Sequence, residues 1–134
     1  MNGGTSILLV EDMGIIAEAM KCALEKGGYC VTVASNGQDA MALLASVGGT
    51  FSSLITDVDL GIGPNGWDIA RYAKAKNPKI EVIYLTGCSL EQWLADGVPN
   101  SQMVQKPITV ALLLKAASTY FDHLAINIDS NSLD

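Results

Sequence analysis

The sequence predicts an α/β fold in which helices cover both faces of a parallel sheet. Short, continuously apolar runs alternate with longer segments of helical periodicity along the chain. Continuous apolar runs are typical of parallel strands that are buried on both faces. Strands that alternate with helices are joined by right-handed crossovers, which place the helices over the sheet. The length of 134 residues fits one domain.

Apolar periodicity and helix start and stop signals give the order of the elements. We expect strands at residues 6–10, 29–33, 51–56, 81–85 and 102–104. We expect helices at residues 13–26, 37–47, 67–76 and 90–95, and a last helix that Thr109 caps. The fourth helix should be short, because residues 90–100 carry weak helix signals.

The first and last helices carry apolar stripes that we expect to face the sheet. The stripe of the first helix consists of Ile16, Ala19, Met20, Ala23 and Leu24. The stripe of the last helix consists of Val110, Leu113, Leu114, Ala117, Phe121 and Leu124. Apolar residues beside these stripes either widen the core or form a surface for a partner; they are Ile15, Cys22, Leu112, Ala116 and Tyr120.

Composition excludes several classes of protein. Hydrophobic residues make up 49% and charged residues 16%, which excludes a disordered chain. The net charge of −6 argues against direct nucleic-acid binding, which depends on cationic side chains. No apolar run approaches the roughly 18 residues of a membrane span. Three cysteines without a CxxC spacing predict neither a disulfide framework nor a zinc site, so we expect a reducing, cytoplasmic location.

Chemically active residues follow the strands at their carboxyl ends. Glu11-Asp12 follow the first strand, Asp57 and Asp59 the third, Thr86 the fourth and Lys106 the fifth. Ligand sites of doubly wound sheets lie at this edge. Clustered carboxylates repel one another unless a cation is present, and oxygen ligands of this kind suit Mg²⁺. A carboxylate beside Mg²⁺, a lysine and a hydroxyl can act as a nucleophile toward a phosphoryl group.

Four segments together resemble the receiver domain of bacterial two-component response regulators. They are Leu8-Leu9-Val10-Glu11-Asp12, Leu54-Ile55-Thr56-Asp57-Val58-Asp59-Leu60, Tyr84-Leu85-Thr86-Gly87 and Lys106-Pro107. The resemblance covers residues 5–122. It implies a flavodoxin-like (βα)5 sandwich with a five-stranded parallel sheet in the order 2-1-3-4-5.

The resemblance also implies a phosphoacceptor and a metal site. Asp57 would take a phosphoryl group from a phosphohistidine on a histidine kinase or histidine phosphotransfer protein. Asp12 and Asp57 would bind Mg²⁺ directly, with Mn²⁺ as a possible substitute. Glu11 would bind the metal through water, and Asp59 through its backbone carbonyl.

Two further residues gain roles from the same resemblance. Thr86 would move toward the phosphoryl oxygens after transfer. Lys106 would pair with Asp57 before transfer and with the phosphoryl group afterwards. The peptide bond between Lys106 and Pro107 is often cis in the family.

The switch positions depart from the family pattern. Met103 stands where the family usually has the Tyr or Phe that turns inward when the threonine moves. A subset of single-domain receivers has an aromatic residue two positions after the threonine, and Cys88 stands there. Tyr84, two positions before the threonine, resembles that subset. Met103 can repack, since methionine adapts to irregular space.

We expect residues 1–122 to form the receiver domain and residues 123–134 a short polar tail, with no output domain. The domain would catalyse only its own phosphorylation and dephosphorylation, as a monomer or weak dimer without membrane insertion, and its downstream partner is unknown. A haloacid-dehalogenase-type phosphatase is one alternative, because Asp57-Val58-Asp59 resembles its DxD motif; Glu11-Asp12 come too early for it. A receiver fold that has lost its chemistry and acts as a binding module is the other.

Overall fold

The computed structural model describes residues 6–46, 51–87 and 90–121. It contains a five-stranded sheet in the order β2-β1-β3-β4-β5, and all its paired strands are parallel, as predicted. The strands are β1 (Ser6–Val10), β2 (Cys30–Ala34), β3 (Ser53–Asp57), β4 (Glu81–Thr86) and β5 (Gln102–Gln105). The helices are α1 (Gly14–Lys26), α2 (Gly37–Ala45), α3 (Gly66–Lys76), α4 (Leu90–Asp96) and α5 (Val110–Phe121).

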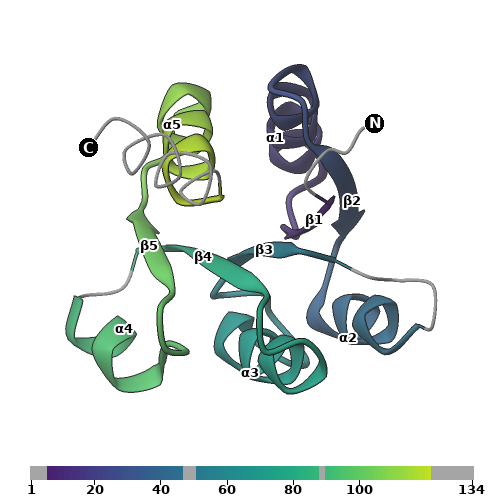
Figure 1. The fold of residues 1–134 in the computed structure, drawn as a ribbon, viewed down its shortest axis with the longest axis vertical. Coiled ribbons are helices and arrows are strands. Elements are labelled where there is room, and N and C mark those ends of the chain that lie inside the picture. Colours follow the sequence, from purple (N-terminus) through teal and green to yellow (C-terminus); the bar gives the residue numbers. More distant parts are fainter. Residues whose placement is uncertain (1–5, 47–50, 88–89, 122–134) are drawn as a thin grey trace, which may run out of the picture.

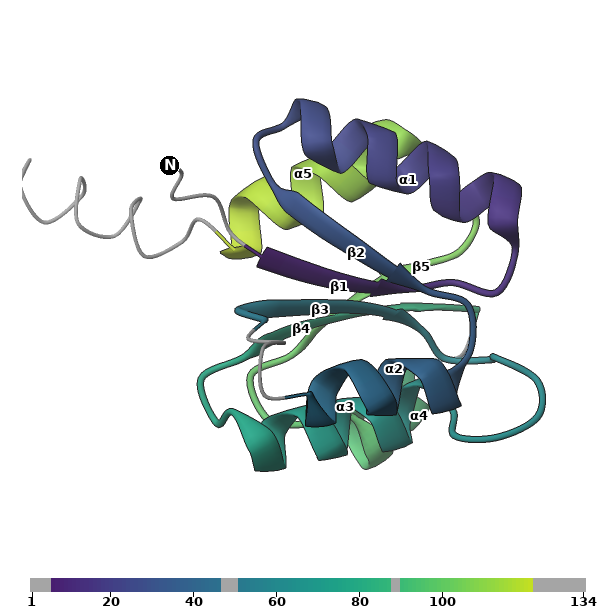
Figure 2. The same ribbon diagram turned by 90° about the vertical axis from the view of Figure 1, so that its right-hand side faces the viewer.

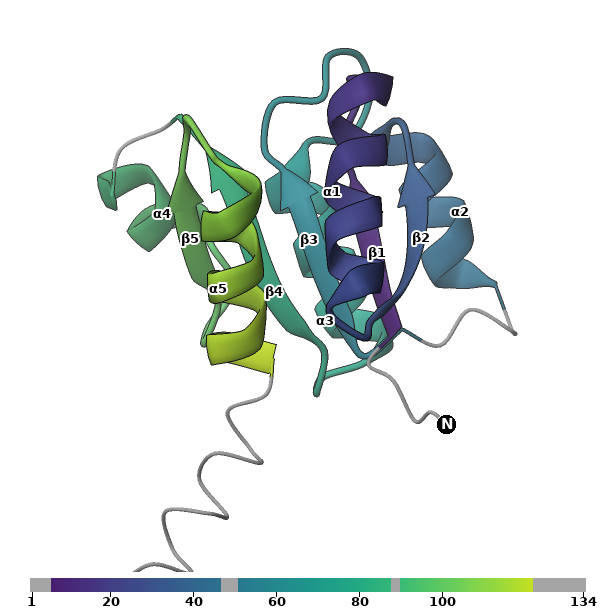
Figure 3. The same ribbon diagram turned by 90° about the horizontal axis from the view of Figure 1, so that it is seen from above.

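The helices form two layers, one on each side of the sheet (Figures 1 and 2). Helices α1 and α5 lie side by side over one face, and Figure 3 shows both in front of the sheet. Helices α2, α3 and α4 cover the other face. The loops that follow β1 and β3 leave the sheet at the same edge (Figure 2). This arrangement brings the carboxyl ends of the strands together.

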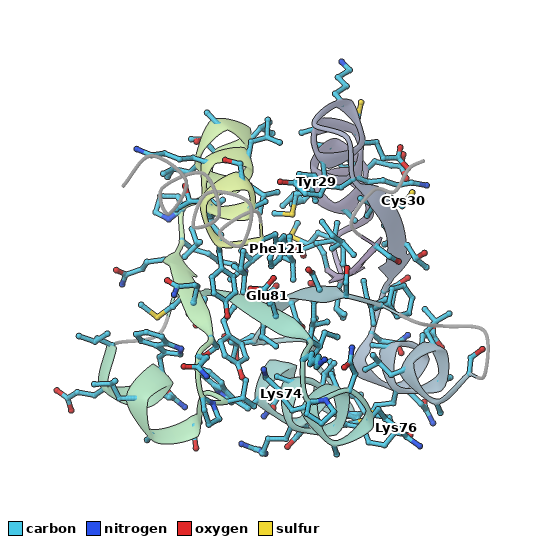
Figure 4. The ribbon with its side chains drawn as sticks, viewed as in Figure 1. Tyr29, Cys30, Lys74, Lys76, Glu81 and Phe121 are labelled. Atoms are coloured by element: carbon cyan, nitrogen blue, oxygen red, sulfur yellow. The ribbon has the colours of Figure 1, made fainter. Side chains whose placement is uncertain are left out.

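Alternation of side chains along the strands produces two separate cores. Ile7 and Leu9 pack under α1 and α5, whereas Leu8 and Val10 pack under α2 and α3. All four are fully buried, which explains the continuous apolar run of this central strand. Figure 4 shows the two layers by their side chains: Phe121 lies with α5, and Lys74 lies on α3 across the sheet.

The stripe predicted for α1 is partly wrong. Met20, Ala23 and Leu24 are buried as expected, but Ala19 is exposed and Ile16 is 39% exposed. The buried face of α1 instead includes Ala17, whereas Ile16 and Ala19 line a hollow between α1 and the start of α5.

On α5, Leu113, Ala117 and Phe121 are buried, whereas Val110 at the first turn is 44% exposed. Leu114 is only partly buried against the core. Leu124 and the expected tail, residues 123–134, lie outside the described residues.

Local sequence signals explain how the helices begin. The Asn36 side chain accepts a hydrogen bond from Asp39 N–H at the start of α2, as an N-cap should. Asn65 and Asp68 form a reciprocal capping box at the start of α3. This cap fixes the first turn of α3, which lies directly beneath the end of β3. Within the described segments, no helix combines the length and apolar character needed to cross a membrane.

Gly66 is required by close packing at this junction. A Cβ atom there would lie 2.4 Å from the Asp57 carbonyl oxygen and 2.8 Å from Val58 Cα. Both contacts are to backbone, so the clash cannot be relieved by rotating a side chain. The glycine therefore allows α3 to approach the strand that ends in Asp57.

We predict that Gly66→Ala lowers the free energy of unfolding by about 1–3 kcal/mol, as overpacking does. Gly14→Ala is the matched control, because Gly14 is also the first residue of a helix and a Cβ there would meet nothing within 4 Å. The control should be neutral or slightly stabilising. Urea denaturation of both variants measures the difference. Equal stability of the two variants would contradict this account of the junction.

Candidate functional site

The ends of four strands place the predicted site residues at one edge of the sheet. Asp57 is the last residue of β3 and Thr86 the last of β4. Glu11 follows β1, and its N–H donates to the Ala34 carbonyl at 3.1 Å. Lys106 follows β5, and its N–H donates to the Thr86 carbonyl at 2.9 Å. These hydrogen bonds continue the sheet ladders beyond the strands, so the backbones of Glu11 and Lys106 are fixed.

Asp57 is a buried carboxylate with an ammonium partner. Its side chain is 4% exposed, and Lys106 Nζ lies 2.8 Å from Asp57 Oδ1. The Lys106 side chain is 40% exposed, so it reaches the carboxylate from the surface. The Thr56 hydroxyl donates to the Asp57 carbonyl oxygen at 2.8 Å, and Gly66 packs against that same oxygen. Backbone contacts from two directions thus hold the acid in place.

Three acidic side chains converge at this point. One carboxylate oxygen from each of Glu11, Asp12 and Asp57 lies within 4.8 Å of the other two. Glu11 is 3% exposed and accepts a hydrogen bond from Met13 N–H at 3.1 Å, whereas Asp12 is exposed. A cluster with two buried members and one exposed member is open to solvent on one side.

Burial and mutual repulsion disturb the ionisation of the cluster. Burial raises the pKa of Glu11, the hydrogen bond from Met13 opposes this, and the charge of Asp57 adds to the rise. Burial also raises the pKa of Asp57, although the hydrogen bond and charge of Lys106 act to lower it. Burial acts to lower the pKa of Lys106, but Asp57, Glu11 and Asp12 outweigh it and raise the pKa. The single ammonium does not fully compensate the acids.

The donor set fits a hard divalent cation. Three carboxylates that face one opening supply oxygen ligands only, and Mg²⁺ is held in proteins by one or two carboxylates, carbonyls and water. A dication would also offset the repulsion within the cluster. Among the described residues, Glu11, Asp12 and Asp57 are the ones that could hold such an ion.

The structure brings most, but not all, of the predicted site residues together. Thr86 is buried at the end of β4, next to the strand that carries Asp57. Asp59 is exposed in the loop after β3, and its carboxylate is not part of the three-acid cluster.

Met103 lies on β5, paired with Tyr84, and is partly buried. Cys88 lies outside the described residues. The peptide bond between Lys106 and Pro107 is cis, in keeping with the resemblance.

Sequence reasoning missed the backbone contacts around Asp57 and the shape of the neighbouring surface. Two hollows that share Ile16, Met20 and Ile108 form a groove between α1 and the start of α5. One end of this groove is lined by Glu11 and Lys106 and the other by Val110 and Leu113. Ile15 is 89% exposed beside it, so the interpretation of Ile15 as additional core is wrong. In the sequence, the adjacent isoleucines Ile15 and Ile16 were the signal for this apolar surface, because two consecutive helix positions cannot both face the core.

Comparison with known proteins agrees with this geometry. The family model of the response regulator receiver domain matches residues 7–118. A response regulator receiver protein from Sinorhizobium medicae has a crystal structure similar to this fold, with a TM-score of 0.82 and 32% identity, covering 90% of this chain and 96% of that one. The chain therefore belongs to the response regulator receiver domain family.

Two curated relatives show the contexts in which such domains occur. The response regulator receiver protein CpdR of Brucella abortus is 36% identical over 81 residues, which are 60% of this chain and 65% of CpdR. The sensor kinase CckA of the same organism is 28% identical over 87 residues, which are 65% of this chain but 9% of the kinase. The chain thus spans less than two thirds of these relatives. Receiver domains take phosphoryl groups from histidine kinases and serve in phosphorylation-dependent signalling.

We predict that Asp12→Asn weakens Mg²⁺ binding by about tenfold or more, because one of three convergent carboxylates is lost. Glu25→Gln is the control, because it also removes one exposed negative charge, but near the opposite end of α1. Calorimetric titration of the two variants and the unmodified protein with Mg²⁺ measures the affinities. If both variants bind Mg²⁺ equally well, the ion does not occupy the three-acid cluster.

Proposed function

We propose that the chain is a phosphorylation-dependent signalling receiver in which Asp57 accepts a phosphoryl group from a phosphohistidine donor. The observation that carries this proposal is the buried Asp57 carboxylate, 2.8 Å from Lys106 and within the three-acid cluster. An Asp57 oxygen attacks phosphorus, the P–N bond of the donor breaks, and its electron pair returns to the imidazole nitrogen. The product is an aspartyl phosphate.

The neighbouring residues would stabilise the charge that develops during transfer. Asp12 and Asp57 would bind Mg²⁺ directly, with Glu11 through water and the Asp59 carbonyl as a further ligand. When bound, Mg²⁺, or Mn²⁺ in its place, supplies positive charge to the phosphoryl oxygens.

Lys106 is placed to follow the negative charge from the carboxylate to the phosphoryl group. Thr86 supplies a hydroxyl at the end of the adjacent strand. Met103, and Cys88 beyond the described residues, would modulate the response.

We place the phosphodonor over the groove between α1 and α5. The groove begins at Lys106 and is otherwise mainly apolar, and the nearly fully exposed Ile15 stands at its rim. A donor protein that covers these side chains would bring its phosphohistidine to the same opening through which Asp57 is reached. Burial of exposed apolar surface would supply part of the affinity.

In this proposal the domain turns over no independent substrate. The domain would catalyse its own phosphorylation and dephosphorylation and would change its downstream partner binding through them. We place it in the reducing cytoplasm, which suits the exposed free thiols of Cys22 and Cys30. No observation favours the phosphatase or the lapsed receiver. The convergence of the Glu11, Asp12 and Asp57 carboxylates and the pairing of Lys106 with Asp57 support the active receiver.

Intact-protein mass after incubation with acetyl phosphate tests the proposal. We expect the protein to gain one phosphoryl group only in the presence of Mg²⁺. Asp57→Asn should gain none, because an amide replaces the carboxylate that acts as the nucleophile. Glu25→Gln is the control, since it converts an exposed acid near the far end of α1 to an amide, and it should still gain the group.

The alternatives give different outcomes in the same assay. Continuous release of phosphate from a phosphomonoester would favour the phosphatase. Failure of the unmodified protein to gain mass, with phosphoramidate as well as acetyl phosphate, would leave a binding module as the better account.

A further inference from the structure

Helix α4 has no fully buried side chain and is attached to the domain mainly through Trp93 and polar contacts. None of its residues is buried, and Leu90 and Leu94 are 55% and 70% exposed. Trp93 is its one partly buried hydrophobic contact with the core of the described residues. The Arg71 guanidinium holds its end by donating to the Asp96 carbonyl at 3.2 Å. An element with so little buried surface can shift at low cost in free energy.

A chain of hydrogen bonds runs from α4 into the sheet. Trp93 Nε1 donates to Ser101 Oγ at 2.9 Å, and Ser101 Oγ donates to the Val98 carbonyl at 2.7 Å. The Val98 N–H in turn donates to the Tyr84 hydroxyl at 3.0 Å. Tyr84, Val98 and Ser101 are all buried. Breaking one bond of such a chain leaves a buried polar group unpaired, so its members are expected to move together.

Tyr84 connects this chain to the phosphoacceptor edge. It lies on β4 two residues before Thr86, and the alternation of the strand puts both side chains on the α3–α4 face. Its ring packs against Trp67, with 4.6 Å between ring centroids. Trp67 follows Gly66, which is in tight contact with the Asp57 backbone. Tyr84 is therefore connected to the site in two ways: along β4 to Thr86, and through Trp67 and Gly66 of α3 to the Asp57 backbone.

We propose that the Tyr84 hydroxyl is a positioning group that couples phosphorylation of Asp57 to α4, through Val98, Ser101 and Trp93. A phosphoryl group on Asp57 alters the end of β4 at Thr86, and Tyr84 passes this displacement to the Val98 amide. The Ser101 bridge then carries it to Trp93. This inference rests on the proposed function, because it requires Asp57 to be phosphorylated.

The two tryptophans of the chain make the inference testable in one spectrum. Trp67 reports on the region near Asp57, and Trp93 reports on α4. With Mg²⁺ and excess acetyl phosphate, we expect both indole N–H resonances of the ¹⁵N-labelled protein to shift. In Tyr84→Phe, which keeps the ring but removes the hydroxyl, we expect phosphoryl gain by mass and the Trp67 shift to persist, and the Trp93 shift to be lost.

Two further variants keep the test decisive if Tyr84→Phe folds poorly. Ser101→Ala cuts the chain beyond Val98, so the Val98 amide should still respond while the Trp93 indole does not. Tyr72→Phe is the matched control: this tyrosine also packs against the same core, its ring faces Lys76 Nζ at 5.5 Å, and both indole shifts should remain.

The outcomes separate this inference from the function on which it rests. An unmodified protein that gains no phosphoryl group overturns both. A protein that gains the group without any Trp93 shift overturns the inference alone. A Trp93 shift that persists in Tyr84→Phe and Ser101→Ala also overturns it, because the signal then reaches α4 by another route.

Discussion

The pairing of a buried carboxylate with an ammonium group at the end of β3 is the interaction on which the rest of the site depends. Asp57 is almost fully buried, and an isolated carboxylate in such a place would be costly to ionise. Lys106, at 2.8 Å, supplies the opposing charge. It can do so because β3, β4 and β5 run parallel, so that Asp57 and Lys106 both lie at the carboxyl edge of the sheet. The fold thus creates the conditions for a reactive acid.

The same burial explains why the acids from β1 matter. Glu11 and Asp12 add negative charge next to Asp57, which one lysine cannot balance. This arrangement stores electrostatic repulsion that a divalent cation can relieve, and the same cation can offset the negative charge of an incoming phosphoryl group. The tight contact of Gly66 with the Asp57 backbone keeps the acid from moving away from its neighbours. The close packing at the β3–α3 junction therefore contributes both to the stability of the fold and to the position of the reactive acid.

The sheet edge could be predicted from the sequence because parallel strands end at a common side. Apolar runs located the strands to within about two residues, and the polar residues at or just after their ends lie at this edge: Glu11, Asp12, Asp57, Thr86 and Lys106. Helix faces were less predictable, because an apolar stripe does not distinguish residues that face the sheet from residues that line a hollow between two helices. Ile16, Ala19 and Val110 therefore belong to exposed surface and not to the core. The link from Tyr84 to Val98 joins a strand side chain to a loop amide, and no sequence spacing encodes it.

Location of the phosphoryl group within the chain tests the central claim most directly. Borohydride reduces an acyl phosphate to an alcohol, so a phosphorylated aspartate becomes homoserine, which peptide mass spectrometry can locate. After treatment with acetyl phosphate and Mg²⁺, we predict homoserine at position 57 alone. Homoserine at position 12 or 59, or a phosphate that survives reduction on Thr86, would contradict the assignment of the buried, lysine-paired carboxylate as the acceptor.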